Sequence, residues 1–214
     1  MLEVALVSFT TLFATIGPLD VAALYAALTV QHSPRERRVF AIKGVIIATL
    51  ILFFFALVGE GVLEHLGISL SALRTAGGIL LLLIAIDMVF ARPSGGTTAT
   101  SEEAEEAGTR ADISVFPLAS PLIAGPGAIG AVMLLMADAR DSLVDTSIVL
   151  AMLAANLFLT LVLLLAATQV QKLLGVTGLH VVSRMVGLML AALAVQFMFD
   201  GLAGSGLFAS GAVG

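Results

Sequence analysis

The chain has 214 residues, of which 59% are hydrophobic and 12% are charged, and its mean hydropathy is +1.11. Soluble domains are closer to half apolar and one-quarter charged, so this composition excludes an ordinary soluble protein and predicts an integral membrane protein. The absence of cysteine excludes disulfide frameworks, cysteine metal sites and thiol relays. The net charge of −5 owes most to four glutamates between residues 102 and 106, and it does not indicate nucleic-acid binding.

Six largely apolar stretches follow one another along the chain, each long enough to cross a bilayer as a helix of about 20 residues. They lie near residues 4–30, 39–59, 68–91, 113–137, 146–168 and 180–201. The N-terminus carries Glu3 and no basic residue, so we expect the first stretch to remain as a span and not to be cleaved as a signal peptide. The sequence therefore predicts an all-α, polytopic membrane protein with six transmembrane helices.

A polar stretch divides the spans into two groups of three. Residues 92–112 are rich in Gly, Ser, Thr and Glu and lack apolar periodicity, which is typical of a flexible, solvated linker. We expect residues 1–91 to form the first three-span unit and residues 113–202 the second. Residues 203–214 are predicted to be a mobile tail.

The basic residues indicate the orientation in the membrane. Eight of the ten fall on one side of the predicted spans: Arg35, Arg37, Arg38, Lys43, Arg92, Arg110, Lys172 and Arg184. Only Arg74 and Arg140 fall on the other side. Because cytoplasmic loops carry an excess of Lys and Arg, the linker is predicted to be cytoplasmic and both termini to lie outside.

Three short segments of the first half resemble segments of the second half in the same order. The pairs are 12–18 with 120–126, 66–69 with 174–177, and 74–77 with 184–187. Each half has an odd number of spans, so the second half enters the membrane from the opposite side. The sequence therefore predicts two inverted three-helix repeats.

The first and fourth spans are predicted to be discontinuous at equivalent places. One contains Gly17-Pro18 and the other Gly125-Pro126-Gly127. Proline removes a backbone N–H and clashes with the preceding turn, while glycine tolerates the dihedral angles of a broken turn. Each second half-helix is predicted to begin at its proline, leaving free N–H and C=O groups near the midplane that suit a small zwitterion. The alternative is a simple kink repaired by Ser, Thr or water.

The stretch FPLASPLIAGPGAI at residues 116–129, together with residues 73–81 and 183–201, resembles the signature of the MarC family. This family of six-span prokaryotic membrane proteins is also grouped as neutral amino acid transporters. The resemblance covers residues 4–202 and implies an inner-membrane location, external termini, and ion-coupled transport of small neutral amino acids such as glycine or alanine. Many members of the family have Asn-Pro or Asp-Pro at the first break, whereas this chain has Gly17-Pro18-Leu19-Asp20.

Four polar side chains near the breaks complete the candidate binding site. Asp20 is expected to face protein or water, because a carboxylate at the centre of a span costs on the order of 2.5–3.5 kcal/mol. It either contacts a substrate ammonium, carries a coupling proton or caps the second half-helix. Asn156 either contacts the ligand or links helices, and Thr15 and Ser120 either bond within their own helices or reach the breaks. The predicted substrate-binding residues are Thr15, Gly17, Pro18, Asp20, Ser120, Gly125, Pro126, Gly127 and Asn156.

Three further polar residues are expected to be mainly structural. Arg74 and Arg184 occupy equivalent places near the starts of the third and sixth spans, where we expect them to anchor the protein by pairing with carbonyls or headgroups. If they faced inward, they would supply the basic cavity that a lipid-headgroup flippase needs. Gln196 is expected to link helices.

The sequence lacks the HExxH, Gly-x-Gly-Asp and paired-aspartate patterns of membrane enzymes, so we expect no catalytic residues, no metal site and no cofactor. The expected function is secondary transport of a small neutral amino acid, coupled to an ion that we take to be a proton, by alternating access. Its partners are then the substrate, the proton and membrane lipid, and not nucleic acid. The alternatives are an exporter of drugs or other small metabolites and a lipid-headgroup flippase.

The predicted orientation can be tested with reporters. A reporter fused after residue 202 should be active outside the cytoplasm, and one inserted near Gly108 should be active in the cytoplasm, because the excess of basic residues holds the linker side inside. The measurement is the activity of a paired periplasmic and cytoplasmic reporter. Exchanged activities would contradict the predicted topology.

Overall fold

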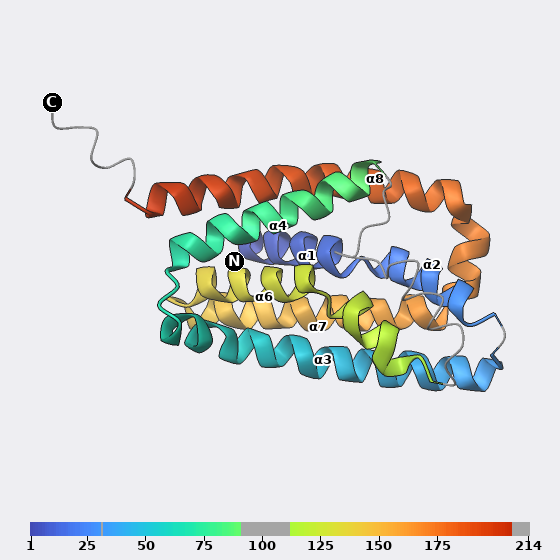
Figure 1. Ribbon diagram of the computed structural model, residues 1–214. Helices are drawn as coiled ribbons and strands as arrows, with labels where there is room; N and C mark the ends of the chain where they lie inside the picture. The colour runs from blue at the N-terminus through green and yellow to red at the C-terminus, as the bar shows by residue number, and fades with distance from the viewer. Residues whose placement is uncertain (31, 91–111, 207–214) are drawn as a thin grey trace, which may run out of the picture.

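The computed structural model describes residues 1–30, 32–90 and 112–206, and these residues form a helical bundle that contains no β-strand (Figure 1). The all-α fold class is confirmed. In chain order the elements are α1 (Leu2–Ile16), α2 (Pro18–Leu28), α3 (Pro34–His65), α4 (Leu70–Phe90), the π-helical segment η1 (Ser114–Ile123), α6 (Pro126–Ala139), α7 (Leu143–Leu165) and α8 (Ala167–Gly204). Most of the predicted linker and tail lies outside the described residues.

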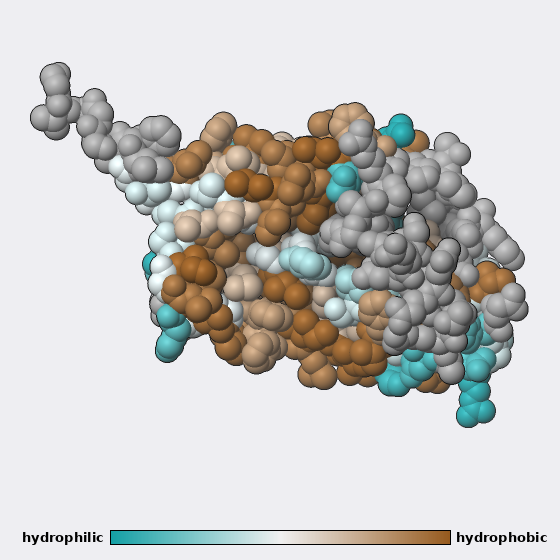
Figure 2. Space-filling model, viewed as in Figure 1, coloured by the Kyte–Doolittle hydropathy of each residue, from teal (hydrophilic) through white to brown (hydrophobic). Residues whose placement is uncertain are grey.

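The apolar helices of the described chain correspond to the predicted spans. Five are long and apolar enough to cross a membrane: Leu2–Ala26, Pro34–Gly59, Leu70–Phe90, Leu143–Leu165 and Arg184–Gly204. A sixth is formed if η1 and α6, which meet at an angle of 52°, count as one broken span. On the face shown in Figure 2, the visible surface over the middle of the bundle is mostly hydrophobic, and the strongly hydrophilic side chains lie mainly toward its ends. The protein is an integral membrane protein.

The start of α8 differs from the prediction. A polar connection was expected between residues 168 and 180, but α8 is helical from Ala167 onward. Figure 1 shows the first part of α8 turning across the end of the bundle before the rest of the helix runs back along it. A count of apolar residues detects only the membrane-spanning part of a helix. Such a count misses a helical segment that contains polar residues, although the segment's backbone hydrogen bonds are still satisfied within the helix. Here the segment contains Gln169, Gln171 and Lys172.

The helices pack in matching pairs. The third span, α4, packs on α6 of the fourth span. The sixth span, in α8, packs on α1 and α2 of the first span. Likewise α3 packs on η1 and α6, while α7 packs on α1 and α2. Helices that the prediction treats as equivalent run in opposite directions along the bundle (Figure 1). These pairings are those that an inverted repeat requires, and the structural equivalence of the two halves stays a prediction.

The most extensive contact joins α4 and α8, and glycines allow the two backbones to approach closely. A Cβ atom on Gly78 would lie 2.7 Å from the carbonyl oxygen of Ala194, and one on Gly187 would lie 3.1 Å from the carbonyl oxygen of Ala85. Gly201 makes a similarly close approach farther along the same pair. Residue numbers rise along one helix as they fall along the other, so the two helices are antiparallel. Small residues at such interfaces replace the hydrophobic driving force that is absent between helices in lipid.

Arg37 holds together the end of the bundle that is predicted to be cytoplasmic. Its guanidinium donates hydrogen bonds to the carbonyl oxygens of His32 at 3.1 Å and Val30 at 3.1 Å, and to the Thr168 hydroxyl at 3.3 Å. Its own carbonyl oxygen accepts a hydrogen bond from the buried Tyr25 hydroxyl. The connection between α2 and α3 is thereby fastened to the start of α8.

A salt bridge fixes the start of η1 on α3. The Lys43 ammonium donates to the Asp112 carboxylate at 2.5 Å, and the Ser114 N–H donates to the same carboxylate at 2.9 Å. Hydrogen bonds from Lys43 and Ser114 lower the pKa of Asp112 to about 2. Both side chains of the salt bridge are nearly half exposed, so the pair positions the chain more than it stabilises the fold.

The close contact between α4 and α8 generates a prediction about stability. Gly78→Ala should lower the free energy of unfolding by about 1–3 kcal/mol, because the added methyl meets backbone atoms that do not move aside easily. The matched control is Gly130→Ala, where nothing lies within 4 Å of the new Cβ. Thermal unfolding in detergent measures both variants, and equal midpoints would contradict the close packing.

Candidate functional site

The first break lies at Gly17, between α1 and α2. Gly17 has φ 59° and ψ 53°, in the left-handed region that favours glycine, and its N–H donates to the Phe13 carbonyl oxygen at 3.0 Å. Pro18 is the first residue of α2, and the Gly17 carbonyl oxygen accepts the Val21 N–H at 2.9 Å. The break and the start of the second half-helix at Pro18 are therefore where the sequence predicts them.

The second break lies at Ala124 and Gly125, between η1 and α6. Ala124 has φ −96° and ψ 63°, Gly125 is extended with φ −82° and ψ 169°, and Pro126 begins α6. The Gly125 carbonyl oxygen accepts the Ile129 N–H at 3.0 Å. This break is also where it was predicted, but its backbone geometry differs from that of the first because no residue is left-handed.

The half-helix before the second break is less regular than expected. Within η1, Phe116 and Ser120 have extended dihedral angles, and each directly precedes a proline, Pro117 or Pro121. Proline disfavours the helical conformation of the residue before it, which explains the two interruptions. The spacing of these prolines was visible in the sequence and was the signal that could have predicted the irregular segment.

The two broken spans pack against each other in opposite directions. α1 packs on α6, and α2 packs on η1. Each break therefore lies where the contact passes from one half-helix to the next, and Figure 1 shows both breaks at similar levels along the bundle. The first N–H groups of α2 and α6 have no acceptor within their own helices, so they are available near the middle of the bundle.

Asp20 lies in the first turn of α2 and is partly buried. Its carboxylate folds back over the break, since one oxygen lies 3.7 Å from the place of a Cβ on Gly17. The adjoining cavity has a volume of about 10 Å³, room for about one water molecule. Its other lining residues include Phe13, Met88 and Val186. In this conformation the first break is closed to a substrate, and the position of Asp20 suits both a capping and a binding role.

The remaining residues of the predicted site differ in exposure. Gly125 and Gly127 are buried, whereas Ser120 and Pro126 are exposed. Thr15 is buried, and its hydroxyl donates to the Thr11 carbonyl oxygen at 2.8 Å, within its own helix. The structure therefore brings the backbone of the second break and Thr15 into the protein interior, and leaves the Ser120 side chain at the surface.

Asn156 is fully buried on α7. Its amide nitrogen donates to the Phe9 carbonyl oxygen of α1 at 3.3 Å and to the Met152 carbonyl oxygen at 3.0 Å. Its amide oxygen has no hydrogen-bond partner among the residues that the structure describes. Asn156 thus links two helices and also presents an unused acceptor, so both predicted roles stay open.

Two buried hydroxyls of α1 were missed by the sequence analysis. Ser8 and Thr11 are 1% and 0% exposed, and their side-chain oxygens have no partner within the described part of the chain. Together with Thr15 they occupy one helical face, since residues three and four apart are neighbours on a helix. Hydroxyls in membrane helices usually bond back to their own backbone, so the sequence offered no sign that these two do not.

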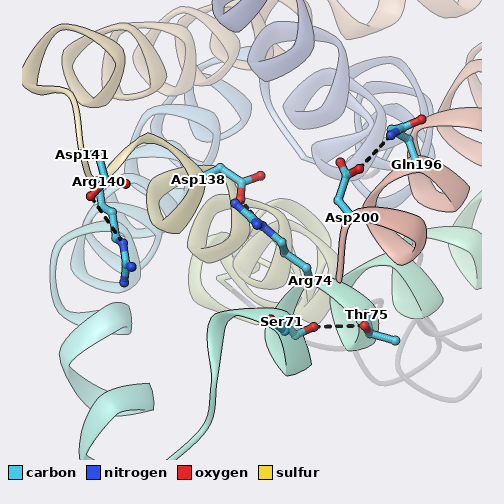
Figure 3. Close-up of polar contacts among 8 residues, drawn as sticks. All are labelled: Ser71, Arg74, Thr75, Asp138, Arg140, Asp141, Gln196 and Asp200. Atoms are coloured by element: carbon cyan, nitrogen blue, oxygen red, sulfur yellow. Dashed lines mark hydrogen bonds and ion pairs between the residues drawn. The ribbon is translucent and has the colours of Figure 1, made fainter. Parts of the chain in front are cut away.

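Arg74 pairs with an acid, whereas a carbonyl or a headgroup was the expected partner. Its guanidinium lies 2.5 Å from the Asp138 carboxylate of α6, and both side chains are less than one-third exposed (Figure 3). This ion pair was not anticipated, because the sequence does not show that α4 packs directly on α6. Arg184 is exposed, and Gln196 donates to Asp200 at 2.8 Å within α8 and does not link helices.

Comparison with known proteins decides the family. The sequence model of the MarC family, described as integral membrane proteins, matches residues 2–205. The chain belongs to the MarC family. It is 39% identical over 204 residues to a UPF0056 membrane protein of Methanocaldococcus jannaschii, covering 95% of this chain and 98% of that protein.

Further relatives have the same extent. A UPF0056 membrane protein of Archaeoglobus fulgidus is 40% identical, with 92% of this chain and 91% of the relative covered. One of Bacillus subtilis is 34% identical, with 92% of each chain covered. No solved structure matches this MarC protein.

The two predicted roles of Asn156 can be separated by substitution. Asn156→Leu should change the free energy of unfolding little, because cross-helix hydrogen bonds in membranes contribute about 0.6 kcal/mol on average and the change also removes an unpaired acceptor. We expect the variant to lose ligand binding, measured by stabilisation against heating. The control is Thr160→Val on the same helix, whose hydroxyl already bonds to the Asn156 carbonyl oxygen. Retained binding with a large loss of stability would identify Asn156 as a purely structural link.

Proposed function

We propose that this MarC family protein is a secondary transporter of small neutral amino acids of the glycine and alanine class. It acts in the inner membrane with both termini outside, is coupled to an ion that we take to be a proton, and works by alternating access. Its partners are the substrate, the proton and membrane lipid, and it needs no catalytic residue, metal or cofactor.

The observation that carries the proposal is the pair of broken spans packed in opposite directions. Irregular backbone within a membrane is tolerated where it is buried in protein or lines a cavity, and paired breaks in equivalent spans are typical of transporter binding sites. At each break a helix N-terminus, which favours a carboxylate, adjoins the carbonyl end of the preceding half-helix, which favours an ammonium. A small zwitterion therefore matches the groups that the breaks supply.

The closed state of the first break supports alternating access. The cavity of about 10 Å³ beside Gly17 is too small for glycine or alanine, so the half-helices have to separate for a substrate to enter. The tight contact between α4 and α8 is suited to remain fixed while the broken spans move. Candidate hinges are the breaks themselves, where few residues absorb a change in dihedral angles.

The alternatives receive less support. A lipid-headgroup flippase needs basic side chains facing an inner cavity, but Arg74 is held by Asp138 and Arg184 is exposed. A drug exporter needs a large apolar chamber, which the cavity at the first break does not provide in this conformation.

Substitution at the second break tests the proposed site. Gly127→Leu and Gly125→Leu should abolish counterflow of labelled alanine in proteoliposomes, because bulky side chains would cover the buried backbone of the break. Gly130→Leu on the same helix is the control, since open space surrounds that residue. Normal counterflow in the correctly inserted Gly127 variant would mean that the break is only a kink.

Asp20→Asn tests ion coupling. The change keeps the size of the side chain and removes its titratable charge, so we expect uphill, proton-driven uptake to be abolished. Retained counterflow would identify Asp20 as the carrier of the coupling proton, whereas parallel loss of counterflow and binding would identify it as the ammonium ligand. Uptake with the same rate and pH dependence as the unsubstituted protein would contradict both roles and leave capping.

A further inference from the structure

A second and larger cavity lies at the end of the bundle where α1 begins. Its volume is about 210 Å³, and it is enclosed by the starts of α1 and α7 together with parts of α6 and α8 near their ends. None of the residues predicted for the helix-break site lines it. Its polar lining consists of Glu3, Ser8, Asp138 and Asp145, and its apolar walls include Val7 and Phe197.

The cavity carries an excess of negative charge. Three of its four polar lining residues are acids, and no basic residue is among those that line it. Arg74 does not line the cavity, but it forms an ion pair with Asp138. That ion pair does not balance the negative charges of Glu3 and Asp145. Asp200 adds a further negative charge in the surroundings of Asp138 (Figure 3). Such a concave, single-sign lining concentrates cations.

Ser8 independently indicates a ligand in this cavity. It lines the cavity, it is 1% exposed, and its hydroxyl has no partner among the described residues. A buried hydroxyl without a partner is unfavourable, so a polar group entering the cavity would supply what the protein does not. The described acids and histidines do not form a group of three that could hold a metal ion.

A polar face connects this cavity with the first helix break. Ser8, Thr11 and Thr15 follow one side of α1 toward Gly17, a distance of about 13 Å at 1.5 Å per residue. All three are buried, and the Thr11 hydroxyl, like that of Ser8, has no hydrogen-bond partner within the described part of the chain. The Asn156 amide nitrogen donates a hydrogen bond to Phe9 of the same helix. The Asn156 amide oxygen has no hydrogen-bond partner among the described residues. These residues form a buried polar face along α1.

We propose that this acidic cavity is a vestibule that receives the ammonium group of the substrate, and that the hydroxyl face of α1 leads this group to the first break. An ammonium has three donors and no acceptor, which matches carboxylates and a hydroxyl. The apolar walls suit a short aliphatic body. Because no basic residue lines the cavity, a primary ammonium without a carboxylate binds more tightly than a zwitterion, and an anion is rejected. The identity of the transported molecule rests on the proposed function, but cation selection does not.

The test compares two alanine derivatives on the full-length protein in lipid nanodiscs at neutral pH. Alaninamide keeps the ammonium and lacks the carboxylate, while N-acetylalanine keeps the carboxylate and lacks the ammonium. We expect calorimetry to detect binding of alaninamide and none of N-acetylalanine. Equal binding of the two, or binding of N-acetylalanine alone, would overturn the proposal.

Substitutions locate the binding. The double variant Glu3→Gln, Asp145→Asn should bind alaninamide at least about tenfold more weakly, since charge-assisted hydrogen bonds are lost. Asp141→Asn is the matched control, because Asp141 lies at the same end of the bundle and its side chain is 94% exposed. Ser8→Ala serves as a second variant that removes an unpartnered hydroxyl and so should not impair folding. Unchanged affinity in Ser8→Ala and in the folded double variant would overturn the vestibule.

A matched pair of substitutions tests the proposed route along α1. Thr11→Val replaces an unpartnered, buried hydroxyl by a methyl group of similar size, whereas the neighbouring Thr10 hydroxyl already bonds to the Leu6 carbonyl oxygen. We expect Thr11→Val to slow alanine counterflow at least about tenfold with alaninamide binding unchanged, and Thr10→Val to leave both unchanged. Equal rates for the two variants would overturn the route.

Failure of the proposed function gives a different result. If the unsubstituted protein shows no amino acid counterflow but binds alaninamide through Glu3 and Asp145, the vestibule stands and the transported molecule is another amine. If counterflow is present and neither the acids nor Ser8 affects binding, the transporter stands and the vestibule is wrong.

Discussion

The structure depends on the requirement that every backbone N–H and C=O group within a membrane be satisfied by the protein itself. Continuous helices meet this requirement without help from their neighbours. The two broken spans do not, because each break leaves the ends of two half-helices near the middle of the bundle. Their mutual packing, α1 on α6 and α2 on η1, buries Gly125 and Gly127 of the second break and partly buries Gly17 of the first. This arrangement is the basis of the proposed site for a polar molecule.

The first break is also the place where this chain departs from the MarC signature that its sequence resembles. Gly17 is left-handed, and the residues that adopt this conformation most readily are Gly, Asn and Asp. Glycine is therefore suited to the backbone conformation of this break. Glycine brings no polar side chain, and here the Asp20 carboxylate folds back over the same place. This chain therefore has a polar group beside the break.

Charged side chains fasten both ends of the bundle. Arg37 and the pair of Lys43 with Asp112 fasten one end, and the pair of Arg74 with Asp138 fastens the other. The Asp20 carboxylate lies beside the first break. A carboxylate is costly at depth in a membrane, so Asp20 beside the first break is the candidate for the proposed proton carrier.

The sequence by itself determined the fold class, the spans and both breaks. These features follow from local chemistry: apolar length decides whether a helix can cross the membrane, and Gly-Pro decides where it cannot continue. Only the tertiary structure decided that Asp138 faces Arg74 and that α8 turns across the end of the bundle. It also decided that the Ser8 and Thr11 hydroxyls have no hydrogen-bond partner among the residues that the structure describes. These features depend on which helix faces which, and in lipid that choice is made by the close fit of small residues such as Gly78 and Gly187. The order of apolar residues in the sequence does not reveal which helices fit together, since lipid tails and neighbouring helices are equally apolar.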